Sequence, residues 1–460
     1  MMPFGSGLAT GLSIGDQIGA SGAEVAWIAA SYPMSQGAFV LIGGRFGDVY
    51  GHKNVLLAGA TWWVVWSLVT GFCHSVVTVS LFRGLTGIGA AFITPNAVAL
   101  LAHTFPPGRL RNIAMGLFGA MAPLGAAGGG AIAALLVQLT PWKWMFFFFA
   151  MLGFSVFSLV FWMVPNAPPS DKGGTIDWVG AYLGVGGLIL FNFVWNQAPI
   201  VGWQNPYEYI LLLISILHFC AFAIWEARIA QSPILPFDIW TAPSVLPLII
   251  VVFLSFMSFG VVSWYTFEWN INIRGYSILS AAAAVQPLTV GGAFAAFTAS
   301  WLIPRLSAQY ILAIGAGAVG ISNLLLATMP AQQIYWQTEF WVVATVAFSP
   351  DFIFTASQIV ASNSVSRDKQ GIAGSLVGTL MTYGMSTGLG FGGTVEAYTN
   401  HDGTHLLRGY RNALYLGIGF AGLSLVLSLL FIRIKKDERE GWADTVETPE
   451  VVERAPGSAV

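Results

Sequence analysis

A single charged residue lies inside a strongly apolar segment of the chain, LFRGLTGIGAA at residues 81–91. A charge at such depth in a membrane helix is costly, and it normally faces a cavity or a partner. The small residues that follow Arg83 allow a second helix to approach closely; they are Gly87, Gly89, Ala90 and Ala91. The segment therefore predicts a bundle of membrane helices with a buried, functional cation at a tightly packed interface.

The composition places the whole chain in a lipid bilayer. Of its 460 residues, 56% are hydrophobic and only 9% are charged, whereas soluble domains carry about 25% charged residues. The net charge of −2 gives no indication of a nucleic-acid partner. The two cysteines, Cys73 and Cys220, form no metal-binding spacing and no disulfide framework.

Thirteen apolar segments are long enough to cross the hydrocarbon core, which takes about 20 residues. They lie near residues 24–44, 54–74, 77–101, 112–138, 142–164, 178–198, 207–225, 244–268, 277–303, 310–329, 336–361, 371–396 and 411–433. Residues 1–14 are apolar and rich in Gly but short, and they predict the end of a first helix whose beginning is missing. We therefore expect an all-α integral membrane protein with fourteen helices, the first incomplete.

The basic residues predict how the chain is oriented. If the turn after the second helix faces the cytoplasm, fourteen of the nineteen Lys and Arg residues lie on that side, including Arg109, Arg111, Arg367 and Lys369. The positive-inside rule supports this orientation, with both termini in the cytoplasm. We expect the plasma membrane as the location, with the vacuole or another internal membrane as the alternative. Residues 435–460 are charged and poor in aromatic residues, which predicts a disordered tail.

The turn between the second and third predicted helices has the sequence GGRFGDVYGHKN, residues 43–54. Glycine permits the tight backbone angles and the close approach that such a turn requires. Asp48 can accept hydrogen bonds from the N-terminus of a neighbouring helix, where negative charge is favoured. An ordinary turn with positive-inside charges is the alternative interpretation.

This turn resembles the signature loop of the major facilitator superfamily, G-x-L-a-D-r-x-G-r-k. Four positions match, namely Gly44, Asp48, Gly51 and Lys53, whereas Phe46, Val49 and His52 depart from the pattern. The segment around Arg83 resembles the fourth-helix motif of the superfamily, l-x-R-x-x-q-G-x-g-a-A, with Thr86 in place of Gln. The resemblance covers about residues 10–433, and the helix count is similar to that of the fourteen-helix drug:proton antiporter family in its fungal branch.

A third motif is GLFGAMAPLGAAGGG, residues 116–130. Membrane helices tolerate proline as a kink, and glycines around it give a narrow surface for packing. The stretch resembles the fifth-helix antiporter motif g-x-x-x-G-P-x-x-G-G, with Ala122 in place of the Gly before proline. The resemblance implies a helix interface formed by Gly119, Pro123, Gly125, Gly128 and Gly129.

Polar residues form stripes on two later spans. Asp351 lies well inside the span 336–361 and shares one helix face with Thr355, Gln358 and Ser362. Such stripes either join helices or line a wet cavity; packing is the simpler interpretation for Ser and Thr, whereas a carboxyl group favours the cavity. Burial favours the neutral form of a carboxyl group, so proton binding at Asp351 becomes possible. The candidate cavity residues are Tyr32, Gln36, Thr94, Gln286, Thr355, Gln358, Thr379 and Thr382.

Together these features predict a major facilitator fold with two six-helix bundles and two inserted central helices. The expected parts are an N-terminal bundle (1–165), the inserted helices with their flanking loops (166–243), a C-terminal bundle (244–434) and the tail (435–460). The resemblance implies proton-coupled export of small amphipathic compounds by alternating access, at a site near the midplane. Asp351 would bind the proton and Arg83 would couple to it. The cytoplasmic gate between the bundles would consist of Gly44, Arg45, Asp48, Gly51 and Lys53.

The expected partners are a small-molecule substrate, protons and the lipid bilayer, with a monomeric protein, no cofactor and no nucleic acid. Uptake by the same fold is the first alternative. A non-transporting sensor is the second, but the residues after 435 are too few for a folded signalling domain. A membrane enzyme is disfavoured because no nucleophile–base pair or metal cluster is apparent. The chain has no G-x-x-x-x-G-K-[ST] loop, which argues against an ATP-driven pump.

Overall fold

The computed structural model describes residues 1–105, 109–166, 168–236, 239–240, 244–365, 370–400 and 403–433. Within these ranges the side chains of residues 109, 111–113, 115 and 116 are not described. The predictions for Arg367, Lys369 and the tail 435–460 therefore lie outside the described residues, as do those for the side chains of Arg109 and Arg111.

The described part of the chain is helical throughout, with no strand. In chain order the helices are α1 (Met2–Gln17), α2 (Gly22–Tyr50), α3 (His52–Thr70), α4 (Val76–Thr104), α5 (Arg109–Pro123), the π-helix η1 (Leu124–Gly128), α6 (Gly129–Leu139), α7 (Lys143–Met163), α8 (Trp178–Val201), α9 (Pro206–Arg228), α11 (Val245–Glu268), the π-helix η2 (Trp269–Ile273), α12 (Ile278–Ala284), α13 (Pro287–Leu302), α14 (Ala308–Thr328), α15 (Glu339–Val346), α16 (Phe348–Asn363), α17 (Gln370–Thr399) and α18 (Leu406–Phe431). Eleven helical stretches are long and apolar enough to cross a membrane. The protein is thus a multi-pass integral membrane protein.

Local sequence signals place several helix ends. At the start of α2 the backbone N–H of Ser21 donates to Glu24 Oε2 at 2.8 Å, which completes a capping box. Asp177 caps α8 by accepting a hydrogen bond from the N–H of Gly180 at 2.9 Å. Between α2 and α3 the chain turns at Gly51, whose φ of 92° favours glycine.

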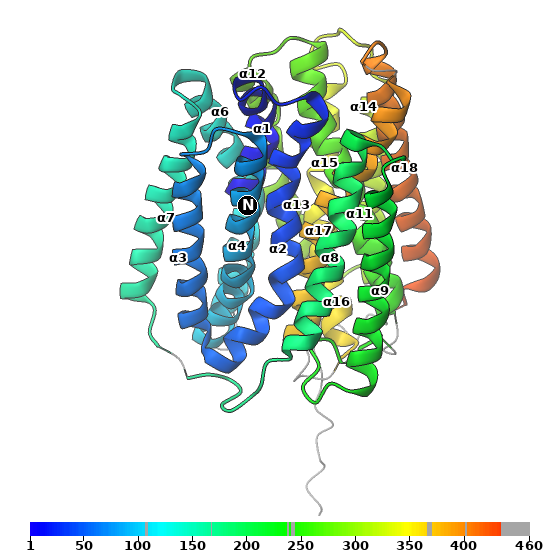
Figure 1. The fold of residues 1–460 in the computed structure, drawn as a ribbon. Coiled ribbons are helices and arrows are strands. Elements are labelled where there is room, and N and C mark those ends of the chain that lie inside the picture. The colour runs from blue at the N-terminus through cyan, green and yellow to red at the C-terminus, as the bar shows by residue number, and fades with distance from the viewer. Residues whose placement is uncertain are drawn as a thin grey trace, which may run out of the picture.

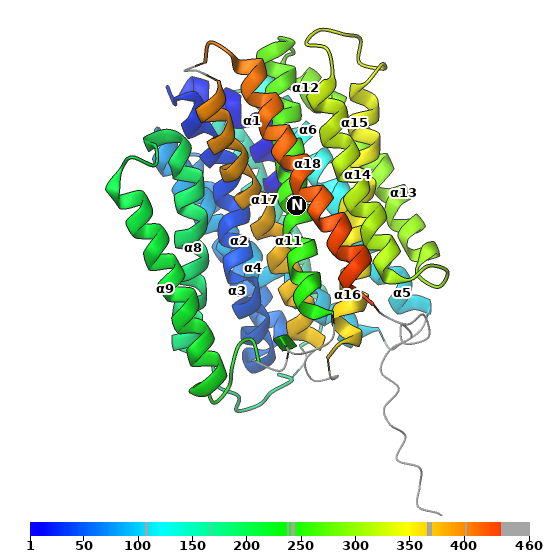
Figure 2. The ribbon, with the colours of Figure 1, turned by 90° about the vertical axis from the view of Figure 1, so that its right-hand side faces the viewer.

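The helices pack as two halves that meet along a central seam (Figures 1 and 2). In the first half α2 packs on α4, α3 on α4 and α7, and α1 on α6; in the second, α14 packs on α18 and α16, and α11 on α17 and α18. Across the seam α2 runs along α17, α5 and η1 pack on α13, and α6 packs on α12. We call the end with the turn between α2 and α3 the Asp48 end, and the end with the turn between α1 and α2 the Gly19 end. Figure 1 shows the Gly19 end at the top.

A hairpin of α8 and α9 lies beside this seam, with α9 at the outer edge (Figure 2). Buried polar side chains bind α8 to both halves: Asn192 Nδ2 donates to Thr387 Oγ1 at 2.8 Å. Ser386 Oγ donates to Asn192 Oδ1 at 2.8 Å and to the Ala30 carbonyl of α2 at 2.9 Å. Tyr383 Oη donates to the Leu188 carbonyl at 2.7 Å. These bonds attach α8 to α17, and Ser386 joins the same group to α2.

The helix α1 is shorter than α2, α3, α4 and α7 of the same half. It has 16 residues, fewer than the about 20 that a membrane-crossing helix needs. Its first residues lie about halfway along the neighbouring helices, where the N label stands in Figure 1. The backbone of Met1 to Leu8 therefore lies at the depth of the central cavity.

Candidate functional site

A cavity of about 360 Å³ lies between the two halves. Its walls are mostly apolar, with aromatic and methionine side chains from both halves: Phe4, Phe118, Met121, Phe259, Phe267, Phe354, Met381 and Met385. Small-molecule sites are commonly apolar cavities of this size with a few polar groups that fix orientation. The cavity is therefore the candidate functional site.

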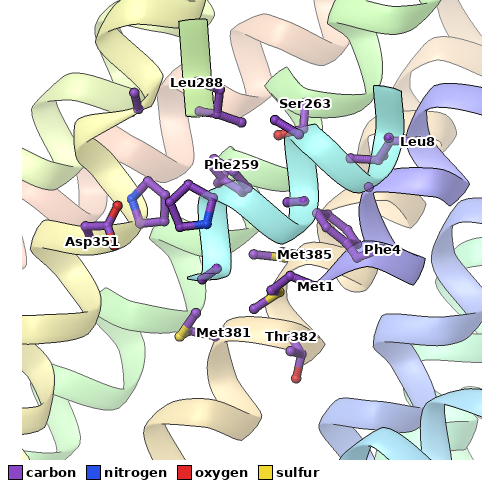
Figure 3. Close-up of a pocket in the computed structure, with 18 of the residues that line it drawn as sticks. Met1, Phe4, Leu8, Phe259, Ser263, Leu288, Asp351, Met381, Thr382 and Met385 are labelled. Atoms are coloured by element: carbon purple, nitrogen blue, oxygen red, sulfur yellow. The ribbon is translucent and has the colours of Figure 1, made fainter. Parts of the chain in front are cut away.

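Asp351 has the only ionisable side chain among the described residues that line the cavity. Figure 3 shows it on one side of the cavity, with Phe4 and Leu8 on the opposite side. Its side chain is 9% exposed, and its Oδ2 atom has no hydrogen-bond partner among the described residues. A buried carboxyl group without a partner is costly when charged. Chemically, the group can take up a proton or bind a cation.

Three of the other predicted cavity residues line the cavity, namely Gln36, Thr94 and Thr382. Gln36 Nε2 lies 3.5 Å from Thr94 Oγ1, a long hydrogen bond between α2 and α4. These side chains can offer donors and acceptors to a bound molecule, and Ser263 and Thr266 of α11 add two hydroxyl groups that sequence analysis missed.

The remaining five candidates lie behind the wall or serve as links between helices. Gln358 Nε2 donates to the Gly374 carbonyl at 3.2 Å, within the second half. Gln286 Nε2 donates to the Ala127 carbonyl at 3.1 Å, across the seam. Tyr32 is buried close enough to Arg83 for an electrostatic interaction. Neither Thr355 nor Thr379 is part of the cavity wall.

Arg83 joins three helices of the first half and does not line the cavity. Its side chain is 3% exposed, and its Nε donates to the Ile28 carbonyl of α2 at 2.6 Å. Its Nη2 donates to the Pro3 carbonyl of α1 at 2.7 Å. Charge-assisted bonds of this length offset part of the cost of burying the guanidinium. A Cβ atom at position 7 would overlap the guanidinium, so Gly7 is needed for this contact.

The predicted gate turn makes its charged contacts with the segment between α7 and α8. Arg45 forms a 2.8 Å ion pair with Asp171 and donates to the Thr175 carbonyl at 3.2 Å. The N–H of Asp171 in turn donates to the Asp48 carbonyl at 3.0 Å. Among the described residues Arg45 thus contacts the segment before α8, and the role of these charges as a gate between the halves stays a prediction. Sequence analysis could not single out Asp171, because it lies in an irregular segment far along the chain.

Other residues of the turn also bind within the first half or beside it. His52 lies 3.6 Å from the Asp48 carboxylate and 2.8 Å from Asn96 Oδ1, while Lys53 lies over the ring of Phe161. Gly44 faces the second half, because a Cβ there would lie 3.1 Å from Ser375 Oγ. Asn96 is a missed residue, and its signal was an amide inside an apolar span.

The glycine- and proline-rich segment of α5, η1 and α6 has two interfaces. Pro123 contacts the second half, since a Cβ at Gly292 would lie 2.5 Å from its Cβ atom. Gly125 and Gly129 instead face Met1 and Met2 at the start of α1, where a Cβ would lie 3.3 and 2.8 Å from the nearest atoms.

Gly119 and Gly128 do not share these interfaces. A Cβ at either residue would meet no atom within 4 Å, so the interface predicted for these two positions is not formed. The physical reason is the helix path, which turns Gly128 away from α1 and leaves Gly119 in the wall of the open cavity.

A second group of carboxyl groups, those of buried Glu268 and half-buried Glu396, lies outside the cavity wall. Tyr410 Oη donates to Glu268 Oε2 at 2.6 Å, and Tyr265 Oη donates to Glu396 Oε2 at 2.7 Å. Each glutamate therefore has a phenolic partner, in contrast to Asp351 Oδ2. Both glutamates are near span ends in the sequence, which gave no indication of these pairs.

A helical membrane bundle in two halves, with an apolar cavity between them and a carboxyl group in its wall, has the architecture of a membrane transport protein. The family model described as Major Facilitator Superfamily matches residues 2–389. The chain belongs to this superfamily.

Relatives and solved structures agree with this assignment. The chain is 37% identical to the efflux pump terJ of Aspergillus terreus, over 90% of this chain and 81% of the relative. It is 36% identical to the aminotriazole resistance protein of Saccharomyces cerevisiae, over 91% of this chain and 79% of the relative. Its fold is similar to a crystal structure of a POT family transporter in complex with a thioalcohol-conjugated peptide, with a TM-score of 0.68 at 13% identity over 94% of each chain.

Proposed function

We propose that this protein exports small amphipathic compounds in exchange for protons, with the central cavity as the substrate site. The observation that carries the proposal is the Asp351 carboxyl group, which lines an apolar cavity between two halves and has one oxygen without a partner among the described residues. Proton binding removes the charge, and proton release restores it. The group can thereby change the cavity between a neutral and an anionic form.

The chemistry of the wall supports an amphipathic substrate. Phenylalanine and methionine side chains provide most of the surface, and methionine adapts to ligands of different shape. Gln36, Thr94, Ser263 and Thr382 supply a small number of hydrogen-bonding groups. The names of two relatives, an efflux pump and a resistance protein, favour export as the direction.

In the proposed cycle the two halves rock about the cavity and expose it to one side at a time. Arg83 contributes to proton coupling indirectly, because its bonds hold α1, whose residues Phe4 and Leu8 form the wall opposite Asp351. The turn at Gly44, Arg45, Asp48, Gly51 and Lys53 gates the Asp48 end, with the Arg45–Asp171 ion pair as its link to the segment before α8.

The proposed architecture is that of fourteen membrane helices in a monomer. Each interrupted span counts as one helix. These spans are α5 with η1 and α6, α11 with η2, α12 with α13, and α15 with α16. Two bundles of six, residues 1–165 and 244–434, then flank the inserted α8 and α9 of residues 166–243. The Asp48 end and the C-terminus face the cytoplasm, α1 begins at the depth of the cavity, and the plasma membrane is the proposed location.

The purified protein in vesicles with an imposed pH gradient tests the proposal. A panel of apolar weak bases and neutral amphipathic compounds should accumulate against their gradients, and a protonophore should abolish the accumulation. Asp351→Asn should lose accumulation but retain exchange of substrate across the membrane.

Glu268→Gln is the matched control, because it neutralises a buried carboxyl group outside the cavity wall. Coupling that survives Asp351→Asn but not Glu268→Gln would refute the assignment of Asp351. Accumulation that requires inward rather than outward substrate movement would identify uptake by the same fold.

A further inference from the structure

A π-helix and a break in a helix face one another across the seam between the halves. The π-helix is η1, Leu124–Gly128, directly after Pro123. Opposite to it, the span of α12 and α13 is interrupted at Val285 and Gln286. Single-turn π-helical segments inside α-helices frequently occur at functional sites. Both features thus lie where the two halves must separate during a transport cycle.

Gln286 joins the two features through its side-chain amide. Its Nε2 atom donates to the Ala127 carbonyl of η1 at 3.1 Å and to the Ala282 carbonyl of its own span at 2.9 Å. Its Oε1 atom accepts a hydrogen bond from Thr289 Oγ1 at 3.3 Å. The amide is therefore fixed on its own side of the seam and points its donor to the other side.

A second hydrogen bond crosses the same seam closer to the Gly19 end. The backbone N–H of Leu279, in the first turn of α12, donates to Gln138 Oε1 of α6 at 3.0 Å. Figure 1 shows α6 and α12 at the Gly19 end of the molecule. Ala127, Ala282 and Val285 line the cavity, whereas Leu279 and Gln138 do not. The two bonds accordingly lie at successive depths between the cavity and the Gly19 end.

Close packing fixes the helices on either side of η1, namely α5 and α6. A Cβ at Gly129 would lie 2.8 Å from Met2, and one at Gly130 would lie 3.1 Å from the Gly5 carbonyl, so α1 fits tightly against α6. Pro123 packs on Gly292 of α13. Since the surroundings are apolar, the Gln286 bond to Ala127 is the polar link that must break if η1 and α12 move apart.

We propose that Gln286 is a positioning residue that keeps the cavity closed toward the Gly19 end by binding the π-helical turn of the opposite half. It acts through η1 and does not itself line the cavity. This proposal rests on the alternating-access function proposed above. Gln138 assists it through the outer bond to Leu279.

The expected effect is a shift between the two access states. Side-chain hydrogen bonds between membrane helices contribute about 0.6 kcal/mol on average, which corresponds to about a threefold change in an equilibrium. Gln286→Leu keeps the approximate size of the side chain and removes the donor. We expect it to raise the population open at the Gly19 end about threefold.

Thiol labelling measures this population without a known substrate. Cys73 and Cys220 are replaced by Ser, and Ser263, which lines the cavity in Figure 3, is replaced by Cys as the reporter. A membrane-impermeant maleimide is then applied from either side of vesicles with oriented protein. Gln286→Leu should speed labelling from the Gly19 side about threefold and slow it from the Asp48 side.

Gln358→Leu is the matched control, because it removes the same kind of glutamine-to-carbonyl bond within a single half. Equal labelling in wild type and Gln286→Leu, or an equal shift in Gln358→Leu, would overturn the proposal. If Gln286→Leu does not reach the membrane, Gln286→Met replaces it, since a thioether has no N–H or O–H to donate to the Ala127 carbonyl. Labelling of the wild-type reporter from one side only, under every pH gradient, would instead refute alternating access itself.

Discussion

The contact between Arg83 and α1 leads to a quantitative prediction for Arg83→Met. Methionine has a similar length and fills the space, but it cannot donate to the carbonyls of Ile28 and Pro3. Polar bonds between membrane helices contribute about 0.6 kcal/mol each on average, and charge-assisted bonds are roughly twice as strong as neutral ones. Only the bond to Pro3 reaches α1, so its loss should weaken the docking of α1 by about 1.2 kcal/mol, or about sevenfold in the local opening equilibrium.

Hydrogen–deuterium exchange of α1, measured by mass spectrometry, reports this opening directly. We expect the first turns of α1 to exchange about sevenfold faster in Arg83→Met, and proton-driven transport to be lost while the protein still reaches the membrane. The exchange rate of α1 in Arg83→Lys should lie between the rates in the wild type and in Arg83→Met. The reason is that an ammonium group lacks the fixed geometry with which Arg reaches two carbonyls.

Arg274→Met is the control for a general loss of stability, since Arg274 is buried and paired with Glu339 in the second half. Exchange of α1 at the wild-type rate in Arg83→Met would refute the reasoning, and so would an equal acceleration in Arg274→Met. Normal transport by Arg83→Met would show that Arg83 has no role in transport.

Acidification of the Gly19 side should accelerate export by the wild type, because protons enter from there, and should leave substrate exchange by Asp351→Asn unchanged when vesicle flux is measured against pH. Gly129→Leu should lower the melting temperature of the purified protein, because a Cβ there already lies 2.8 Å from Met2, whereas Gly128→Leu should have little effect; the reverse order would contradict the packing. Arg45→Ala should lower the free energy of unfolding by less than about 1 kcal/mol, since the Arg45–Asp171 pair is partly exposed. A double-mutant cycle with Asp171→Ala measures the coupling between the two residues. A coupling energy above that limit would show that the ion pair is stronger than its exposure implies.

The membrane spans were predictable because apolar length and composition decide them. The predicted spans 77–101 and 411–433 correspond closely to α4 (Val76–Thr104) and α18 (Leu406–Phe431). The breaks inside spans were not predicted, since η1 and the interruption at Gln286 depend on contacts with the opposite half. The apolar residues repeat with a period of 3.6 residues on both sides of such a break, so the sequence pattern does not indicate it.

The candidate site was predictable for groups that stand out from an apolar background. Asp351, Gln36, Thr94 and Thr382 stood out as polar residues within spans, and all four line the cavity. The aromatic and methionine walls could not be recognised, because the same residue types face lipid. The partners of Arg83 were also beyond reach, because they are backbone carbonyls 55 and 80 residues away in the chain.

The attachment of α8 to α17 imposes an order on the synthesis of the protein. Asn192 bonds to Thr387, which the ribosome adds 195 residues later. At about 5–20 residues per second that interval lasts on the order of 10–40 s. Until α17 enters the bilayer, Asn192 Nδ2 lacks its acceptor Thr387, whereas Asn196 Nδ2 can still donate to Asn192 of the same helix. An unpaired amide is costly in a hydrocarbon environment. The newly made hairpin of α8 and α9 must therefore be sheltered at the insertion machinery until the late helices arrive, and chains that end before α17 should become substrates for membrane quality control.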